Sequence, residues 1–518
     1  MNGFPVLTIL TFLPFAGALA VSFLRPKKRT LARGLALGFS LGVLALTLLL
    51  WAGFNTSAAH LQFEESYVWI PSLAVRYHLG IDGLGLLMLL LSAIVVPMAM
   101  LASWHIQERA PLYFGLVLFL QTGLIGTFTA LNFFHWFLFW ELSLIPAFFL
   151  IRLWGGPLRV PAATQFFIYT MAGSVALLLG FLAIFFATGK FDFMDLAQMG
   201  RDGTLVSALA DKLGWTQMSS STLALVIFFG VFLGLAVKVP IMPFHTWLPA
   251  AYAEAPTGTS MLLTGVMSKM GLYGFLRILL PVFPGQLQWM RTPLLWLAVI
   301  TIIFSASSAF AQRDLKRVLA YSSINHLGYC LLGIFAVMGS GALLQDPQVE
   351  KAAALNGVFL QMFNHGLTAA SLFWFAGFLE RRGGGLRGLD DFGGLRRVAP
   401  VFCGLMGIAL FASLGLPGLN GFVSEFLIFK GAFPLSTWAT GLAAIGLLIT
   451  AVFILSILQR VFNGPLNVKW STFSDLSITE RLAVLPALGL MLILGIYPQL
   501  LLGMFNSTVL EMVSHLRF

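Results

Sequence analysis

The stretch LAVKVPIMPFHTWLP, residues 235–249, places Lys238 and three prolines inside an otherwise apolar run. A second stretch, LGLPGLNGFVSEFLIFK (414–430), places a proline and three glycines ahead of Glu425. Because proline removes a backbone donor and glycine loosens a helix, both runs predict helices that break at mid-membrane. Carbonyls freed at such a break can bind water, a cation or a protonated side chain. A break beside a buried charge, occurring twice, indicates a functional feature.

The composition of the chain explains why these runs are expected to lie in a bilayer. Of the 518 residues, 58% are hydrophobic and 10% are charged, and the mean hydropathy is +0.91. Soluble domains carry about 25% charged residues, so the composition excludes a soluble enzyme, a disordered chain and a disulfide scaffold. Cys330 and Cys403 lie far apart in apolar segments, which excludes a CxxC site and an iron–sulfur ligand set. We predict an all-α, polytopic membrane protein.

Runs of about 20 apolar residues, the length that spans a bilayer core, predict the individual membrane helices. Fourteen such runs occur, at 4–24, 31–52, 82–101, 111–131, 132–151, 163–187, 221–250, 257–280, 293–311, 317–338, 354–378, 400–433, 437–460 and 483–504. The sequence lacks the alternating apolar pattern of a membrane barrel, which leaves helices as the spanning structure. No basic region precedes the first run, so we expect a retained helix and not a cleaved signal peptide.

Lysine and arginine are distributed unevenly between alternate connections. The connections after the odd-numbered helices hold nineteen of these residues, and the other connections hold eight. The positive-inside rule places the first set in the cytoplasm, so we expect a multi-pass membrane protein with both termini outside. This asymmetry also accounts for the net charge of +10, and no basic stripe with interleaved aromatic residues favours a nucleic-acid partner.

A few ionisable residues fall near the middle of the predicted spans. They are Glu141, Lys238, Lys269, His326, His365 and Glu425. A charge at the bilayer centre costs about 2.5–3.5 kcal/mol, so these residues must face one another or water. We interpret them as a path for protons or ions, with structural ion pairs as the alternative. Lys430 also lies within a predicted span, close enough to its end to reach the interface by snorkelling.

The spacing of four of these residues predicts an internal repeat. Glu141 precedes Lys238 by 97 residues, and His326 precedes Glu425 by 99, each time two helices upstream. Units of five helices start on opposite sides of the membrane, which makes the repeat inverted, as is usual in secondary transporters. We divide the chain into a three-helix N-terminal segment, two inverted repeats, and a last helix with its tail: 1–110, 111–280, 293–460 and 461–518.

Several segments resemble those of one known family. They are WELSLIPAFFLI (140–151), VKVPIMPFHTWLP (237–249), EAPTGTSMLLTGVMSKMGLYGFLR (254–277), AQRDLKRVLAYSSINHLGY (311–329), NHGLTAASLFW (364–374) and GLPGLNGFVSEF (415–426). Together they resemble the antiporter-like membrane subunits of respiratory complex I, and most closely the chain M type of NADH–quinone oxidoreductase. Glu425 favours this type because the chain L and chain N relatives carry lysine there. The chain also ends without the long lateral helix of chain L.

The resemblance implies roles for the matching positions in the first repeat. Glu141 would be the acid of the fifth helix, and Lys238 its partner in a switchable ion pair. Lys269 would be the central relay. Proton movement would be driven by quinone reduction in other subunits of the complex.

The resemblance also implies roles in the second repeat and for partner subunits. His326 and His365 would continue the hydrated path, and Glu425 would be the terminal proton-exchanging group. NADH, FMN, iron–sulfur clusters and quinone would bind to partner subunits, with no cofactor or metal in this chain. Its neighbours in the membrane would be subunits of the chain L and chain N types.

One segment departs from the family pattern. The family commonly continues WLP with Asp-Ala-His, whereas this sequence has Ala250, Ala251 and Tyr252. Proton uptake near this end therefore uses water, His245 and Glu254, or it lies elsewhere. His245 by itself is more typical of a hydrogen-bonded structural residue.

Other functions remain open at the level of sequence. An Mrp-type cation/proton antiporter subunit has the same fold, and a hydrogenase- or ferredoxin-linked relative of complex I is equally compatible. A purely structural membrane scaffold is the alternative from a different class. The electron donor, the quinone type and the choice of proton or sodium are not encoded in recognisable motifs.

Overall fold

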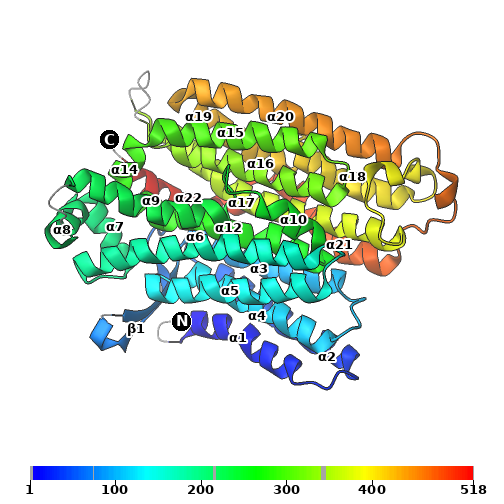
Figure 1. Ribbon diagram of the computed structural model, residues 1–518, viewed down its shortest axis with the longest axis horizontal. Coiled ribbons are helices and arrows are strands. Elements are labelled where there is room, and N and C mark those ends of the chain that lie inside the picture. Colours follow the sequence, from blue (N-terminus) through cyan, green and yellow to red (C-terminus); the bar gives the residue numbers. More distant parts are fainter. Residues whose placement is uncertain (1–3, 74, 214–217, 340–345, 517–518) are drawn as a thin grey trace.

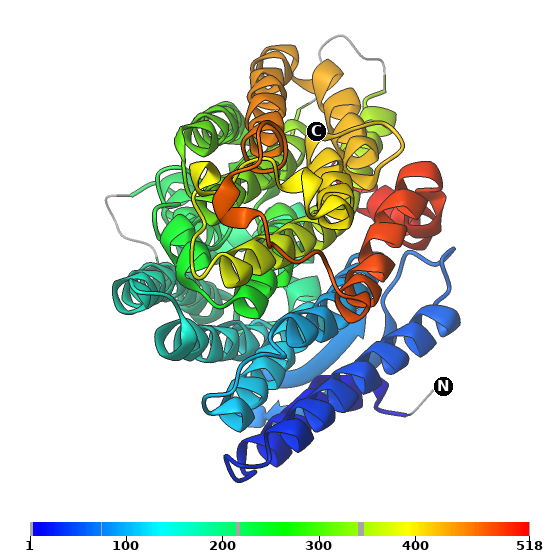
Figure 2. The same ribbon diagram turned by 90° about the vertical axis from the view of Figure 1, so that its right-hand side faces the viewer.

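The computed structural model describes residues 4–73, 75–213, 218–339 and 346–516. Most long helices run in roughly the same direction and form one bundle (Figure 1). Seen end-on, α1 and α2 lie at one edge of this bundle (Figure 2). The first thirteen helices are α1 (Val6–Ser22), α2 (Arg29–Gly53), α3 (Gly83–Ala102), α4 (Ala110–Thr129), α5 (Phe133–Trp154), α6 (Arg159–Thr188), α7 (Phe193–Arg201), α8 (Thr204–Leu213), α9 (Ser220–Lys238), α10 (Trp247–Glu254), α11 (Thr257–Leu262), α12 (Ser268–Gly274) and α13 (Leu280–Val282).

The second half of the chain continues the bundle. Its helices are α14 (Pro284–Trp289), α15 (Arg291–Ala311), α16 (Leu315–Ala336), α17 (Gln348–Arg382), α18 (Pro400–Leu414), α19 (Asn420–Leu435), α20 (Thr437–Ile457), α21 (Ile478–Ile496) and α22 (Gln499–Ser514). Two π-helical turns, Leu263–Met267 and Phe275–Leu279, join α11, α12 and α13 into one continuous rod. A third π-helical turn, Leu458–Phe462, extends α20.

The apolar runs predicted from the sequence correspond to helices. Each of the fourteen runs overlaps at least one helix, and eleven helices within the described residues are long and apolar enough to cross a membrane. The apolar helices α1 and α18 are shorter. The prediction of an all-α membrane protein is confirmed, whereas the count of fourteen crossings stays a prediction.

Both predicted helix breaks are confirmed, whereas their position at mid-membrane stays a prediction. In the first, α9 ends at Lys238 and α10 begins at Trp247. In the second, α18 ends at Leu414, and Gly415 and Gly418 follow with φ angles of 80° and 92°. Glycine adopts this left-handed conformation without the steric cost that a Cβ brings, so these residues let the chain turn sharply before α19.

The last predicted span, 483–504, is wrong in its bounds. The structure divides this region into α21 and α22, with Tyr497 and Pro498 between them. Because Pro498 lacks a backbone N–H, it cannot continue the hydrogen bonding of α21, and it instead precedes the first residue of α22.

A β-hairpin between α2 and α3 was not predicted. Its antiparallel strands β1 (Gln62–Ile70) and β2 (Val75–Ile81) pair Tyr67 with Tyr77 and Ser66 with His78. The short helices α7 and α8, which lie in a connection, were also not predicted. The beginning of α1, the end of α22, the hairpin, α7 and α8 all lie toward the same end of the bundle (Figure 1).

The rod formed by α11, α12 and α13 is the centre of the bundle. Its apolar residues are buried, and α3 and α17 pack against its first half. On either side, α4 packs against α5 and α6 against α9, while α15 packs against α16 and α17 against α19. These are the equivalent helix pairs of the two units that the spacing predicts, and the inverted repeat itself stays a prediction.

Candidate functional site

Lys269 of α12 and His365 of α17 meet at the centre of the bundle. Lys269 Nζ lies 2.8 Å from Nδ1 of His365 and donates to the carbonyl of Thr264 at 2.6 Å. Lys269 is 0% exposed and His365 is 6% exposed. Two positive charges at this distance in a buried site are unfavourable, so the pair holds at most one excess proton.

The π-helical turn Leu263–Met267 shapes the surroundings of Lys269. The carbonyl of Thr264, within this turn, accepts from Lys269 Nζ and from Ser268 Oγ, the latter at 3.0 Å. Such turns interrupt the regular hydrogen-bond ladder and are frequent at functional sites of helices. The local irregularity thus supplies an acceptor for a buried ammonium group.

His326 of α16 continues this line toward Glu425 of α19. His326 Nδ1 lies 3.0 Å from Oε1 of Glu425, and Nε2 lies 3.1 Å from Oγ of Ser413. The Nδ1 contact is close enough for an ion pair, although it lacks the geometry of a directed hydrogen bond. The rings of His326 and His365 have centroids 5.3 Å apart. Four of the predicted residues therefore form one chain of neighbours: Lys269, His365, His326 and Glu425.

A small cavity adjoins the middle of this chain. It offers about 10 Å³ to the centre of a water molecule, which corresponds to about one water. His365, Ser413, Ser322 and Ser323 contribute polar groups to its wall. Since Ser413 contacts His326, a water here can link His365 to His326 through the serine hydroxyl.

Glu425 lies in a polar neighbourhood that the break between α18 and α19 creates. Gln361 Nε2 is 3.5 Å from its carboxylate, and the oxygen of the same amide accepts from Ser424 at 2.5 Å. Asn364 of α17 donates to the backbone carbonyl of Asn420 at the start of α19. These amides tie the broken helix to α17 and hold the acid in a fixed place.

Lys238 and Glu141 occupy a separate part of the first half. Lys238 Nζ lies 4.7 Å from the centre of the Trp140 ring, and the side chain is 3% exposed. Glu141, on α5 beside Trp140, is partly exposed and interacts electrostatically with Lys238. Among the described residues, however, no contact ion pair joins them, and Glu141 Oε1 has no hydrogen-bond partner. The two side chains are close enough to interact electrostatically but are not in contact.

The end of α10, where the sequence departs from the family pattern, holds a structural network. Glu254 accepts from Arg387 Nη2 at 2.6 Å and from the backbone N–H of Leu158 at 2.9 Å. Arg387 also pairs with Asp314, the N-cap of α16, at 2.6 Å. Both carboxylate oxygens of Glu254 are therefore occupied by hydrogen-bond donors.

His245 lies between α9 and α10 and is 6% exposed, and its Nδ1 has no partner among the described residues.

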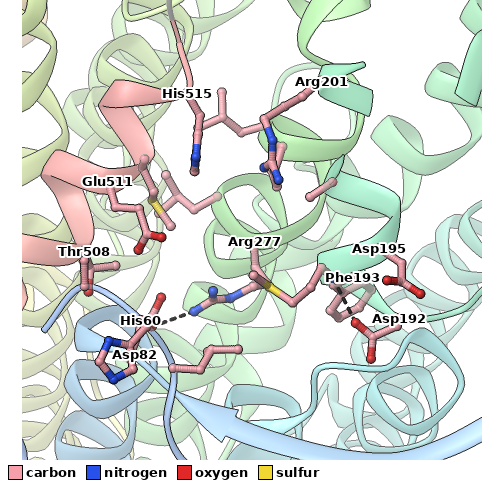
Figure 3. Close-up of a pocket in the computed structure, with 18 of the residues that line it drawn as sticks. His60, Asp82, Asp192, Phe193, Asp195, Arg201, Arg277, Thr508, Glu511 and His515 are labelled. Carbon is pink, nitrogen blue, oxygen red and sulfur yellow. Dashed lines mark hydrogen bonds and ion pairs between the residues drawn. The ribbon is translucent and has the colours of Figure 1, made fainter. Parts of the chain in front are cut away.

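Arg277 is a buried residue inside the predicted span 257–280 that was not among the candidate residues. It lies in the rod near α13, 8% exposed, and its Nη2 is 2.6 Å from Oδ1 of Asp82, the N-cap of α3. The pair lines a cavity of about 660 Å³. Figure 3 shows it together with Glu511 of α22 and His515, the residue that follows this helix. The pair balances a buried charge at this end of the rod.

His78 joins the hairpin to α7 at the edge of the same cavity. Its Nδ1 lies 2.5 Å from Oδ2 of Asp192, and its Nε2 lies 3.0 Å from Oε1 of Glu64. Asp192 also caps α7, because its other oxygen accepts from the backbone N–H of Met194. Burial lowers the pKa of His78, but the two carboxylates outweigh it and raise that pKa above the ordinary value.

Comparison with known proteins gives the family of this chain. Residues 130–451 match the family described as NADH:quinone oxidoreductase/Mrp antiporter, TM. NADH-quinone oxidoreductase subunit M of Rhodobacter capsulatus is 35% identical over 98% of this chain and 96% of its own length. The F(420)H(2) dehydrogenase subunit M of Methanosarcina mazei is also 35% identical, over 98% of each chain.

Solved structures agree with this relationship. A chain of respiratory complex I from Thermus thermophilus with bound NADH superimposes with a TM-score of 0.82 at 26% identity, covering 99% of this chain and 100% of that one. A chain of the Mrp complex from Dietzia sp. has the same fold, with a TM-score of 0.81 at 18% identity and the same coverage. The chain therefore belongs to the NADH:quinone oxidoreductase/Mrp antiporter membrane family, and within it to the subunit M type of NADH-quinone oxidoreductase.

Proposed function

We propose that this chain moves protons across the membrane as a non-redox subunit of NADH–quinone oxidoreductase. The observation that carries the proposal is the chain of neighbours Lys269, His365, His326 and Glu425 in the interior of the bundle. If these residues only held the helices together, pairs of opposite charge would be sufficient. Here a lysine contacts a histidine, an arrangement that suits a shared proton better than an ion pair.

The first half of the chain would control when the proton moves. A carboxylate that approaches a lysine stabilises its ammonium form, and a carboxylate that withdraws favours loss of the proton. Quinone reduction in other subunits would change the electrostatics near Glu141 and so alter its separation from Lys238. The structure, with Lys238 over Trp140 and away from contact with Glu141, resembles the separated arrangement.

The second half would carry the proton onward. An excess proton on the Lys269–His365 pair would pass by way of His365 and the adjoining water to Ser413 and His326. Glu425 would accept it and exchange it with the far side. Each nitrogen or oxygen in this sequence lies in contact with the next or faces a cavity that fits about one water.

The same proposal covers partners and location. The relatives that this chain matches are named as subunits of larger oxidoreductases. We expect membrane neighbours of the chain L and chain N types, and a bacterial inner membrane with both termini outside. We expect NADH, FMN, iron–sulfur clusters and quinone to bind to partner subunits. No group of three or more potential metal ligands occurs among the described residues.

The closest alternative is an Mrp-type antiporter subunit. The likeness to the Mrp complex and to a membrane-bound sulfane sulfur reductase, at 18% and 21% identity, establishes the fold alone. A tagged chain purified in mild detergent separates the alternatives, because its copurifying subunits are identified by mass spectrometry. Redox subunits that oxidise NADH support the proposal, whereas Mrp subunits or a hydrogenase contradict it.

The alternative of a purely structural scaffold is tested by measuring proton transport. The purified complex is reconstituted in proteoliposomes, and internal acidification is recorded during NADH oxidation. We expect Lys269→Ala to abolish acidification while the complex stays assembled. Equal acidification by the variant and the native complex would support the scaffold and contradict the proposal.

A further inference from the structure

A second small cavity adjoins Lys238 of α9 and Ser268, the residue that precedes Lys269 in α12. Its wall is formed by Lys238, Trp247, Tyr252, Leu263, Met267 and Ser268. It offers about 10 Å³ to the centre of a water molecule, which again corresponds to about one water.

Lys238 gives an independent reason to place a water there. The side chain is 3% exposed, and its ammonium group makes no hydrogen bond within the parts of the chain that the structure describes. Its contact is with the face of the Trp140 ring, which satisfies charge but leaves the three N–H donors without acceptors. A buried ammonium without acceptors is costly, so a water in the adjoining cavity would stabilise Lys238.

Tyr252 forms one wall of this cavity and is fixed in place. It is 1% exposed, and its hydroxyl donates to the carbonyl of Leu263 at 2.9 Å. Leu263 begins the π-helical turn that also surrounds Lys269. Because the hydroxyl proton is committed to that carbonyl, the phenol oxygen is left to accept a hydrogen bond from a water or from Ser268, with which it interacts.

Ser268 connects the cavity to the second lysine. Its Oγ lies 3.4 Å from Lys269 Nζ, and the same residue lines the cavity together with Lys238. The hydroxyl donates to the carbonyl of Thr264 and is free to turn toward other acceptors. A hydroxyl is both a donor and an acceptor, so Ser268 can receive one proton and release another.

We propose that Tyr252 is a positioning residue for proton transfer from Lys238 to Lys269. Its oxygen holds the water in line between Lys238 and Ser268. This inference rests on the proposed function. It gives a role to Tyr252, which stands where the family pattern commonly has histidine.

One proton moves from Lys238 to Lys269 through the water and Ser268. The Lys238 ammonium gives a proton to the water, and the water gives one of its own protons to Ser268 Oγ. Ser268 then gives its original hydroxyl proton to the neutral amine of Lys269. The water and the serine end with the protons they began with, Lys238 becomes neutral, and Lys269 becomes charged. Tyr252 keeps its proton throughout.

The test uses the whole purified complex in proteoliposomes, with acidification measured at matched rates of NADH oxidation. Tyr252→Phe removes the oxygen and keeps the buried ring. We expect it to lower the initial rate of acidification about fivefold, the factor that corresponds to one net hydrogen bond. Ser268→Ala has a similar or larger effect. The control is Tyr113→Phe, which removes a buried hydroxyl that contacts Ser103 at 2.8 Å and Thr259 at 3.3 Å and neither lysine.

The double variant distinguishes positioning from a loss of packing. Because Tyr252 and Ser268 act on the same water, the combined substitution should slow acidification no more than the stronger single one. Acidification by Tyr252→Phe at the rate of Tyr113→Phe overturns the inference, as do strictly multiplicative effects in the double variant. Failure of the proposed function is seen separately, as full acidification by Lys269→Ala.

Discussion

Lys269 Nζ and His365 Nδ1 lie 2.8 Å apart, on two helices whose contact surface is closed to solvent. When Lys269 is charged and donates, the neutral histidine accepts at Nδ1 and carries its own proton on Nε2. If the proton moves to His365, the lysine becomes the acceptor. The contact thus gives two states of similar geometry that differ in the location of one proton.

Removal of either residue in the first-half pair should stop pumping. We expect Glu141→Ala and Lys238→Ala to assemble into the complex and to oxidise NADH without acidifying proteoliposomes. The physical reason is that each variant leaves the other residue without the partner that sets its protonation. Blue-native electrophoresis checks assembly. Full pumping by either variant would show that the pair does not control the path.

Glu425→Gln tests the end of the path. The amide keeps the size of the side chain and its bond to Gln361 but cannot accept and release a proton at neutral pH. We expect acidification to fall by at least about tenfold, since a group that transfers protons contributes about a hundredfold or more. The measurement is the acidification rate of reconstituted complex. A rate near that of the native complex would place the exit elsewhere.

Arg387→Ala tests the network at the end of α10. It leaves Glu254, whose side chain is 3% exposed, without its positive partner. Breaking a buried pair on one side costs about 3–5 kcal/mol, so we expect a clear fall in the unfolding temperature of the detergent-solubilised chain. Arg396→Ala, which alters an exposed arginine in the same loop, is the matched control. Equal unfolding temperatures for the two variants would contradict the role of the network.

The link between His78 and its two carboxylates should depend on pH. Because the pKa of His78 is raised in the folded chain, its stabilising effect is fully present below the ordinary value of 6.5 and is lost as the pH rises through the raised pKa. We expect amide hydrogen exchange in β2 and at the start of α7, corrected for the intrinsic rate, to become faster over that interval.

The control for this prediction is His78→Gln, which cannot titrate. Its corrected exchange rates should not change over the same interval of pH. Identical pH profiles for the native chain and the variant would show that His78 does not control the attachment of the hairpin.

The helices and their two breaks were predictable because they follow from local chemistry. Long apolar runs require a membrane, and the prolines and glycines near Lys238 and Glu425 interrupt helices wherever the chain folds. The hairpin was not predictable in the same way, because β1 has a mixed burial pattern and lies in a short segment between two spans. Its position depends on contacts such as His78 with Asp192, 114 residues apart.

The candidate residues were predictable as a set, but their contacts were not. Buried charges are rare in this chain, so the ionisable residues stood out from the sequence. Ser268 and Ser413, by contrast, resemble many other serines in membrane helices, and only their distances to Lys269 and His326 distinguish them. The separation of Glu141 from Lys238 depends on side-chain placement, which no spacing rule determines.

The most direct test of the account is the acidification rate of proteoliposomes that contain the complex with Lys269→Ala, compared with Lys430→Ala. Lys269 is 0% exposed and belongs to the proton path, whereas Lys430 is exposed. We expect the first variant to lose acidification while the complex stays assembled, and the second variant to keep most of it. Full acidification with Lys269→Ala would contradict the claim that protons cross this chain through its buried residues.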